Sequence, residues 1–295
     1  MINYSIIIPH RNIPHLLQRC LDSIPRRDDI QIIIVDDNSD VSIVNFDQFP
    51  GMGEKGVDII FTKEGKGAGY ARNVGLKYAK GKWLLFADAD DYFTDEILTI
   101  CDDNCLSTNI NELIVFNSKS VDSKTLKEIK KKEKQTSIYI KNQDENILRY
   151  VSHLVWGKIY LLDSIRKYKI QFDEVPAAND VTFAGYAGFY LKNLRFDSRI
   201  GYVFTARESS ISTNYSSSYL NSHIKVAFRY NSFLKEKKIN IKYWINILGL
   251  LRRLYMVDKQ SFKIQFHKYY TQISFRRKLI DLYQCLTNFL HNSFS

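Results

Sequence analysis

The chain has 295 residues, and 45% of them are hydrophobic, which is enough for a sizeable globular core. Its formal net charge of +10 is unevenly distributed: residues 216–295 contain 14 Lys and Arg against 3 Asp and Glu, whereas residues 1–215 contain 28 against 29. No apolar run is long enough to span a bilayer, so the composition argues against a transmembrane protein.

We expect a cytoplasmic protein. Met1–Tyr4 run directly into a strand-like segment, without the basic region or the small-residue cleavage site of a signal peptide. Four scattered cysteines do not complete a zinc site, and buried free thiols in a reducing compartment are the better interpretation. They are Cys20, Cys101, Cys105 and Cys285.

Three apolar runs near the N-terminus predict strands that are buried on both faces: Tyr4–Pro9, Gln31–Val35 and Val57–Phe61. Between the first two, the apolar residues of Leu16–Ile24 recur at helical spacing. A glycine-rich loop, Gly65–Gly69, leads into a second helix. Strands that alternate with helices predict a parallel α/β sheet with right-handed crossovers.

The stretch Gly81–Asp91 organises the sequence. Its apolar residues predict a fourth buried strand, which ends in Asp88, Asp90 and Asp91. Ligands bind at the carboxyl ends of strands in open α/β sheets, and Mg²⁺ is usually held by one or two carboxylates together with substrate phosphates. The triplet is therefore a candidate metal–diphosphate clamp. By itself it also suits a solvated acidic turn that caps a helix.

The rest of the chain continues with strands and helices. Strands are expected over Glu112–Asn117 and Leu194–Thr205, and helices over Thr94–Cys105, Asn142–His153 and Asp180–Tyr190. Residues 119–134 are lysine-rich and suit a solvated excursion or hairpin, and Ser209–Ser218 suits a polar link. Apolar residues from Ile241 to Tyr255 and from Phe262 to Ile273 predict helical faces. We expect a domain of residues 1–215 followed by a basic, aromatic-rich helical extension of residues 216–295.

Two strand ends now carry acidic clusters, Asp36–Asp37 and Asp88–Asp91. In a parallel sheet both lie at one edge, where carboxylates can accept hydrogen bonds from a base or ribose while a metal neutralises phosphates. The Gly65–Gly69 loop can let backbone approach a ligand closely, but it has neither the Walker ending nor the spacing of a dinucleotide fingerprint. The planar guanidinium of Arg72 can donate two hydrogen bonds to a base or phosphate. The alternative is that Arg72 is simply an exposed residue of the helix.

Four segments match a known family in order and spacing: Ser5–Pro9, Ile34–Ser39, Gly69–Gly75 and Phe86–Asp91. Over about residues 4–93 they resemble the N-terminal half of family 2 glycosyltransferases with the GT-A fold. A looser resemblance continues through Trp156–Tyr160, Asn179–Phe183 and Arg207–Ser212. Residues 216–295 carry no motif of this family.

The resemblance implies a GT-A-like, Rossmann-type mixed sheet, mainly parallel and flanked by helices, with a C-terminal helical extension. It also implies inverting transfer of a sugar from a nucleotide-diphosphate donor with Mg²⁺ or Mn²⁺. UDP-sugars are the commonest donors of the family. Residues 1–117 would form the nucleotide-sugar half of the catalytic domain, and residues 118–215 the acceptor half.

The resemblance further implies roles for single residues. Asp90 would bind the metal that bridges the diphosphate, and Asp88 would lie near both the ribose and the metal. The donor-binding residues are expected to be Pro9, Arg11, Asp37, Gly67, Arg72, Asp88 and Ala89. Asp91 has no assigned ligand, and capping of the following helix suits it as well.

Inversion needs a base that takes the proton of the acceptor hydroxyl. Family members commonly supply it as the Asp of a Glu-Asp pair at the start of a later helix, and here the pair is Asn179-Asp180. Asp180 is therefore the expected base, with helix capping as the alternative. Asn179 departs from the family pattern. Trp156, Lys158 and Asn179 are candidate acceptor residues, although Trp156 alone also suits packing.

The expected acceptor is a saccharide or lipid-linked saccharide of capsule- or lipopolysaccharide-type assembly. The basic tail would then contact the inner face of an anionic membrane, where each nearby Lys or Arg contributes about 1 kcal/mol. Helix packing or a homo-oligomer interface is the alternative for the tail. Nucleic acid is disfavoured, because no motif that reads bases is present.

Two other functions stay open. One is a catalytically silent sugar-nucleotide-binding or scaffold protein, which the departure at Asn179 makes conceivable. The other is a nucleotidyltransferase, which would be expected to carry a glycine-rich basic signature in the first loop. Pro9–Asn12 does not supply one.

Overall fold

The computed structural model of the chain describes residues 1–106, 111–129, 135–206 and 216–293, with the backbone alone from 286 onward. Within these ranges the strands form one eight-stranded sheet in the order β3-β2-β1-β4-β7-β6-β8-β5. The strands are β1 (Tyr4–His10), β2 (Ile30–Asp37), β3 (Val57–Thr62), β4 (Trp83–Phe86), β5 (Tyr92–Phe93), β6 (Leu113–Asp122), β7 (Lys158–Leu161) and β8 (Leu194–Ala206).

The sheet is mixed but mainly parallel, which confirms the predicted fold class. β3, β2, β1 and β4 pair in parallel, and β6 pairs in parallel with β8. β7 is antiparallel to both β4 and β6, and β5 is antiparallel to β8. β1 and β2 are buried at almost every position because helices cover both faces of the sheet.

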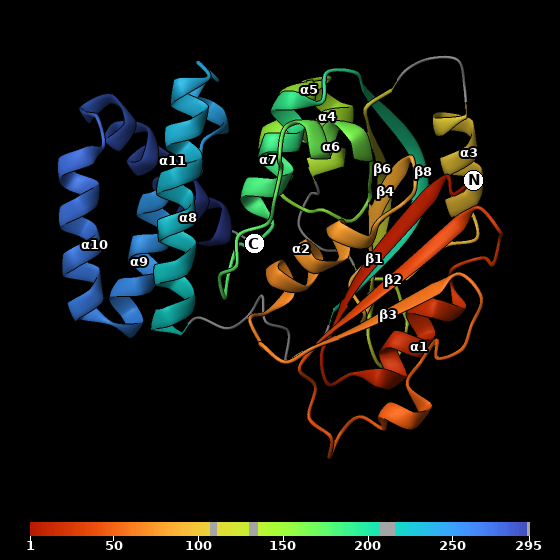
Figure 1. The fold of residues 1–295 in the computed structure, drawn as a ribbon. Coiled ribbons are helices and arrows are strands. Elements are labelled where there is room, and N and C mark those ends of the chain that lie inside the picture. Colours follow the sequence, from red (N-terminus) through yellow and green to blue (C-terminus); the bar gives the residue numbers. More distant parts are fainter. Residues whose placement is uncertain (107–110, 130–134, 207–215, 294–295) are drawn as a thin grey trace.

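Helices cover both faces of the sheet and give a three-layer arrangement, and a helical extension lies beside it (Figure 1). The helices are α1 (Pro14–Asp22), α2 (Ala68–Tyr78), α3 (Ile97–Cys105), α4 (Gln135–Asn142), α5 (Glu145–Tyr150), α6 (Leu162–Lys167), α7 (Val181–Tyr190), α8 (Ser217–Glu236), α9 (Ile247–Val257), α10 (Lys259–Gln272) and α11 (Phe275–Ser293), with 3₁₀ turns η1 (Phe46–Gln48) and η3 (Ile241–Tyr243). No helix in the described ranges combines the length and apolarity that crossing a bilayer requires.

Each face of the sheet has its own apolar core. Ile6, Ile8 and Ile34 point toward α1 and α3. Ile7 and Val35, on the opposite face, pack with α2, α5, α6 and α7. The alternation follows from the two-residue period of a strand, so two faces are buried by one continuous apolar run. Cys20, Cys101 and Cys105 are buried free thiols, as predicted, and Cys285 is a half-buried one.

The structure corrects several predicted boundaries. The helix predicted over Asn142–His153 is shortened to α5, because Gln143 has a positive φ and Asp144 caps α5 by accepting from the Asn146 N–H. Helix α3 begins only at Ile97, since Thr94 instead bonds the Ile200 carbonyl.

In the tail, the face predicted from Ile241 to Tyr255 is divided between η3 and α9, because Asn246 caps α9 by accepting from the Gly249 N–H. Strand β6 extends into the lysine-rich segment as far as Asp122. Most of the predicted polar link Ser209–Ser218 lies outside the described residues, as does the looser motif Arg207–Ser212.

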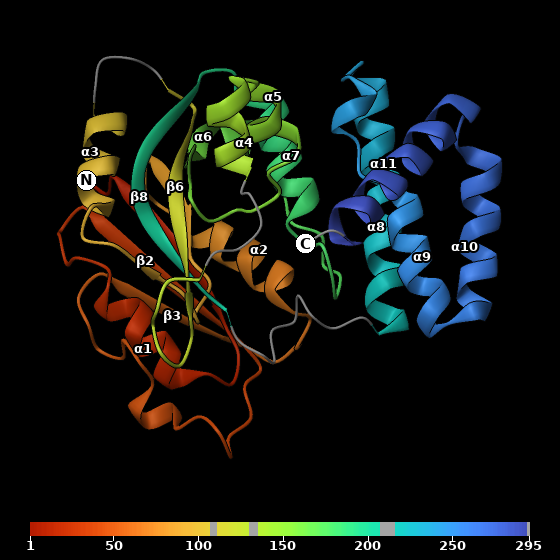
Figure 2. The same cartoon turned by 180° about the vertical axis from the view of Figure 1, so that it is seen from behind.

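The helical extension packs on the α/β part through α7 and α8 (Figures 1 and 2). Val181 of α7 and Tyr230 of α8 share one apolar cluster. Tyr230 is fully buried and donates from its hydroxyl to the Tyr150 carbonyl. Gly185 makes the close approach possible, because a Cβ built there lies 2.2 Å from the Tyr230 ring. The division at residue 215 into two domains stays a prediction.

Gly185→Ala should lower the free energy of unfolding by about 1–3 kcal/mol, because the added methyl overpacks the α7–α8 contact. Urea unfolding measures this effect. Gly249→Ala is the matched control: its Cβ meets nothing closer than 3.7 Å. Since alanine is favoured over glycine in helices, the control should be neutral or stabilise by roughly 0.5–1 kcal/mol. Equal effects of the two substitutions would contradict the packing described.

Candidate active site

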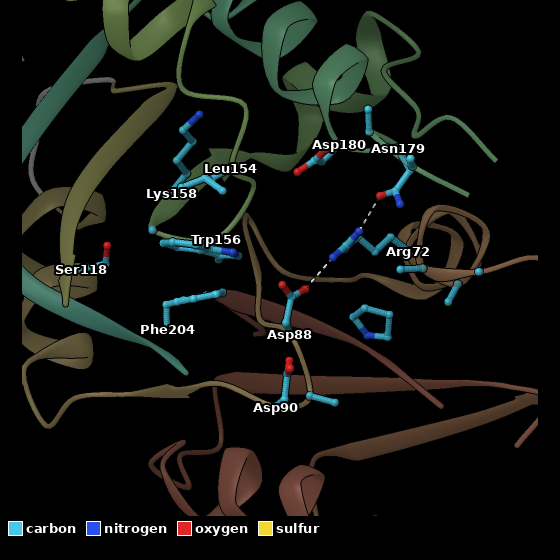
Figure 3. Close-up of a pocket in the computed structure, with 18 of the residues that line it drawn as sticks. Arg72, Asp88, Asp90, Ser118, Leu154, Trp156, Lys158, Asn179, Asp180 and Phe204 are labelled. Atoms are coloured by element: carbon cyan, nitrogen blue, oxygen red, sulfur yellow. Dashed lines mark hydrogen bonds and ion pairs between the residues drawn. The ribbon is translucent and has the colours of Figure 1, made fainter. Parts of the chain in front are cut away.

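A cleft of about 1000 Å³ lies at the carboxyl ends of β1, β2 and β4 and extends between α2 and α7 toward β6 and β8 (Figure 3). It is lined by all the residues that the sequence singled out for donor, metal, base and acceptor roles. These are Pro9, Arg11, Asp37, Gly67, Arg72, Asp88, Ala89, Asp90, Trp156, Lys158, Asn179 and Asp180. Residues separated by up to 171 positions thus meet in one cavity.

The first strand end is fixed by a buried histidine that sequence reasoning missed. His10 lies opposite Asp36 in the β1–β2 register, and its Nδ1 is 2.7 Å from the Asp36 carboxylate. The Ile13 N–H donates to His10 Nε2, so Nδ1 carries the proton of a neutral imidazole. Burial raises the pKa of Asp36, but hydrogen bonds from His10 and Ser39 outweigh it and leave the pKa below its ordinary value. This network holds the loop that carries Arg11.

The second strand end is tied to the glycine-rich loop. The Asp37 carboxylate accepts from the Gly67 N–H at 2.5 Å and from the Lys66 N–H at 3.3 Å. Gly67 has φ +93°, a conformation that other residues rarely adopt, so glycine lets this backbone turn toward the carboxylate. The loop and β2 therefore form one wall of the cleft.

Arg72 connects the two sides of the cleft. Its guanidinium donates to Asp88 Oδ1 at 2.5 Å and to Asn179 Oδ1 at 2.9 Å (Figure 3). It also lies over the Phe172 ring, with Cζ 5.3 Å from the ring centroid. Arg72 is nearly buried, which contradicts the alternative of an exposed helix residue. The end of β4 is thereby linked to the residue that precedes Asp180.

Asp88 and Asp90 both line the cleft, whereas Asp91 turns away from it. Asp91 is fully buried and accepts from the Tyr202 hydroxyl at 2.9 Å and from the Thr205 N–H at 2.7 Å. Capping of the next helix by Asp91 was therefore a wrong expectation. Burial, together with the charges of Asp88 and Asp90, raises the pKa of Asp91 well above its ordinary range.

The oxygen atoms of Asp88 and Asp90 suit a hard divalent cation. Asp88 and Asp90 offer carboxylate oxygens at one strand end, and the cleft beside them leaves room for further ligands. In the described part of the chain no group of three or more His, Cys, Asp or Glu side chains gathers around a common point. Two carboxylates suit a cation whose other ligands are phosphate oxygens and waters, as is usual for Mg²⁺.

Asp180 and Lys158 line the other side of the cleft. Asp180 directly precedes α7, and its side chain makes no capping hydrogen bond. Burial raises the pKa of Asp180, although the positive charges of Arg72 and Lys158 oppose the shift. Lys158 is buried and donates to the Ser152 carbonyl at 2.5 Å. Burial lowers the pKa of Lys158 to about 7, against the attraction of Asp180.

Stacked aromatic rings form the wall opposite Arg72. The Trp156 ring stacks on Tyr202 at a centroid distance of 4.9 Å and on Phe204 at 5.8 Å. Trp156 thus fulfils its packing role and lines the cleft as well. Ser118 and Leu154 lie on the same side (Figure 3). Sequence reasoning missed Phe204 and Ser118 of the strands and Leu154 of the loop before β7, because no local pattern distinguishes a residue that faces a cleft.

Comparison with known proteins places the N-terminal segment in a family. Residues 5–101 match the family model described as glycosyl transferase family 2. The chain is 30% identical over 240 residues to a poly(ribitol-phosphate) beta-glucosyltransferase of Bacillus spizizenii, a match that covers 76% of this chain and 34% of that protein. It is 25% identical over 189 residues to the poly(ribitol-phosphate) beta-N-acetylglucosaminyltransferase TarS of Staphylococcus aureus, covering 62% and 32%. The chain spans about a third of the length of these two relatives.

Solved structures share the fold over nearly the whole chain. S. aureus TarS 1–349 in complex with UDP-GlcNAc has a TM-score of 0.60 and 19% identity, covering 94% of this chain and 78% of that one. The mannosyltransferase PcManGT of Pyrobaculum calidifontis, in complex with GDP-Man and Mn²⁺, has a TM-score of 0.56 and 14% identity, covering 97% and 80%. The predicted GT-A fold and the resemblance to family 2 are confirmed.

The buried Lys158 predicts a pH-dependent stability. Its pKa is about 7 in the folded chain against an ordinary 10.5, so the unfolded state binds more protons between these values and the folded state gains stability as pH rises through them. Lys158→Met removes this dependence and loses one hydrogen bond worth about 1 kcal/mol. The free energy of unfolding of the variant minus that of wild type should therefore be largest near pH 7 and should decrease toward about pH 10, because wild type gains stability over that range.

Urea unfolding at both pH values measures this difference. Lys167→Met, which changes an exposed lysine of α6, should show no such trend. A stability difference for Lys158→Met that does not vary with pH would contradict the lowered pKa.

Proposed function

We propose that this chain, whose residues 5–101 match family 2 glycosyltransferases, is a metal-dependent, inverting glycosyltransferase that moves a sugar from a nucleotide-diphosphate donor to an acceptor hydroxyl. The observation that carries the proposal is the convergence of Arg72, Asp88 and Asp90 with Asp180 in one cleft. The first three belong to the matched segment, and Asp180 comes from an unmatched part of the chain. Such a cleft holds a donor phosphate region and a carboxylate base together.

The donor would lie along the ends of β1, β2 and β4. Pro9, Arg11, Asp37 and Gly67 would surround the base and Arg72 would face base or phosphate, with Asp88 and Ala89 near the ribose. A UDP-sugar is the proposed donor. Support comes from the UDP-GlcNAc complex of TarS, whereas the GDP-Man complex of PcManGT shows that the same fold accepts another base.

Asp90 and Asp88 would hold Mg²⁺ or Mn²⁺, which supplies positive charge to the departing nucleoside diphosphate. Arg72 would add a fixed positive charge at the same place, since its guanidinium is already held by Asp88 and Asn179. Burial of these groups strengthens their effect on a developing negative charge, because the cleft excludes part of the solvent.

Asp180 would take the proton from the acceptor hydroxyl. Burial raises its pKa, which strengthens the carboxylate as a general base, while the charges of Arg72 and Lys158 oppose the shift. The hydroxyl oxygen would then attack the anomeric carbon from the side opposite the diphosphate. The bond to the diphosphate oxygen breaks with its electron pair, and the configuration inverts.

The acceptor would lie against Trp156 and Phe204, whose stacked rings offer an apolar surface to a sugar ring or polyol chain. Lys158 and Asn179 border the same space. We propose a saccharide or lipid-linked saccharide of surface-polysaccharide assembly, as the names of the curated relatives suggest. We also propose a cytoplasmic location. A homo-oligomer and contact with the membrane through the tail belong to the same proposal.

Asp180→Asn should lower transfer by about 10²–10⁴-fold and leave nucleotide binding unchanged, because only the base is removed. Transfer and release of free nucleotide are measured over a panel of UDP-, GDP- and dTDP-sugars. The wild-type rate should fall as pH decreases through the raised pKa of Asp180. The residual rate of the variant should not show this fall.

Asp163→Asn is the matched control for this substitution, since it makes the same change in the exposed first turn of α6. Nucleotide binding without transfer from any donor would instead favour a silent binding protein. Release of pyrophosphate would favour a nucleotidyltransferase.

Asp90→Ala should abolish donor turnover and also the gain in UDP affinity that Mn²⁺ provides, since the proposed metal loses a carboxylate ligand. Calorimetric titration with UDP, with and without Mn²⁺, reads the metal dependence independently of activity. Asp95→Ala, which removes an exposed carboxylate beyond the strand, should keep both properties. Full turnover by Asp90→Ala, or by wild type with a strong chelator, would refute the clamp.

A further inference from the structure

Over the side chains that the structure describes, residues 275–285, helix α11 buries a charged pair and exposes apolar residues, which is the reverse of an ordinary surface helix. It lies behind α8 and α9 in Figure 1 and in front of them in Figure 2. Its inward face carries the ion pair Arg277–Asp281, with both side chains almost completely buried and Nη2 2.6 Å from Oδ1. Its outward face carries large apolar side chains. Phe275, Leu279, Leu282 and Tyr283, called here the α11 stripe, are 75%, 51%, 48% and 68% exposed.

The buried face of α11 explains why the helix is held in this orientation. Arg277 donates to the carbonyls of Ile241, Trp244 and Ile245, and Tyr269 donates to Asp281 at 2.9 Å. Arg277 of the ion pair thus supplies hydrogen bonds to backbone carbonyls in the segment before α9. Burying a charged pair adds little net stability, yet removing one partner is costly, so the pair fixes orientation rather than supplying a core.

No described residue of α11 belongs to the apolar cluster that joins α8, α9 and α10. The spacing of the stripe, at positions i, i+4, i+7 and i+8, is that of the face a helix ordinarily buries. Here that face points to solvent. Contiguous exposed apolar patches of this kind mark interaction surfaces.

The charges around the stripe indicate what covers it. Between residues 247 and 285 the only acids are Asp258 and Asp281. Asp258 accepts from Ser217 and Ser261, and Asp281 is buried with Arg277. The cations of the same helices lie at the surface: Arg252, Arg253, Lys259, Lys263 and Arg276 are exposed, and Lys268 and Lys278 are half-buried. The described outer surface of these helices is therefore positive and apolar.

Cations and apolar rings are also interleaved at short range. Lys278 of α11 lies over the ring of Tyr270 of α10, with Nζ 4.0 Å from the ring centroid, and Tyr270 is itself 64% exposed. The stripe is thus continued onto α10 through this contact. The Lys278 ammonium also donates to the Tyr270 carbonyl at 2.7 Å, which ties α11 to α10 at this apolar surface. Lysine stems that cover apolar surface are typical of helices that lie in a membrane interface.

We propose that α11 is an in-plane membrane-binding helix, whose stripe enters the apolar boundary of an anionic lipid surface while the flanking Lys and Arg contact the headgroups. A second copy of the chain is a poorer occupant, because it would bring a surface of the same positive sign. The proposal identifies the surface that contacts the membrane. It does not depend on sugar transfer, so its test can fail or succeed separately from that of the proposed function.

Flotation of the full chain with vesicles tests the proposal. Wild type should bind vesicles of equal parts phosphatidylglycerol and phosphatidylcholine, bind pure phosphatidylcholine much more weakly, and lose affinity as salt rises. The double variant Phe275→Ser/Leu279→Ser should bind the anionic vesicles about tenfold or more weakly, because two apolar side chains no longer enter the lipid.

The matched control is Val41→Ser/Ile43→Ser, which removes two apolar side chains of similar exposure, 81% and 52%, from the loop after β2. It should bind vesicles like wild type. Circular dichroism checks that both double variants keep the helical fold. Equal vesicle binding by the stripe variant and wild type would overturn the proposal. A wild-type dimer that the stripe variant dissociates, seen by light scattering without lipid, would also overturn it in favour of a second copy.

Discussion

The contact on which the site depends most is the bridge that Arg72 makes between Asp88 and Asn179. One planar guanidinium joins two segments, at Asp88 and Asn179, that lie 91 residues apart, and its fork geometry allows both hydrogen bonds at once. A Cβ on Gly69 would lie 2.1 Å from the Asp173 carbonyl, so the start of α2 can approach the loop before α7 only because glycine stands there. The end of β4 and the start of α7, the proposed donor and base sides, are thereby held at a fixed separation.

The neutral side chain of Asn179 affects the electrostatics of this bridge. An acid at this position would pair with Arg72 and compete with Asp88 for its charge. With an amide, Asp88 is the one carboxylate bonded to Arg72 among the described residues, and Asn179 only orients the fork. The charge of Arg72 then also acts on Asp180, where it opposes the pKa increase caused by burial. The departure from the family pattern is therefore compatible with an ionised base.

Much of the fold and the site could be predicted because it is encoded locally. The apolar runs of β1, β2 and β4 end in acids, and the ends of parallel strands meet at one edge, so Asp37, Asp88 and Asp90 could be placed together from sequence. His10 and Phe204 could not, since their importance arises from partners in register or across the sheet. The orientation of α11 was equally hidden. A helical period identifies an apolar face, but the partners of Arg277 decide which face is buried.

Asp91 shows how the acidic triplet can be both ligand and scaffold. Its buried carboxylate binds Tyr202 and Thr205 of β8, and the Tyr202 oxygen in turn accepts from the Asp88 N–H at 3.0 Å. Tyr202 also stacks on Trp156, a ring of the aromatic wall. Asp91 therefore fixes the position of Asp88 relative to the aromatic wall. Because Asp91 faces inward, Asp88 and Asp90 are left to face the cleft, and the same short turn after β4 supplies both the architecture and the proposed metal ligands.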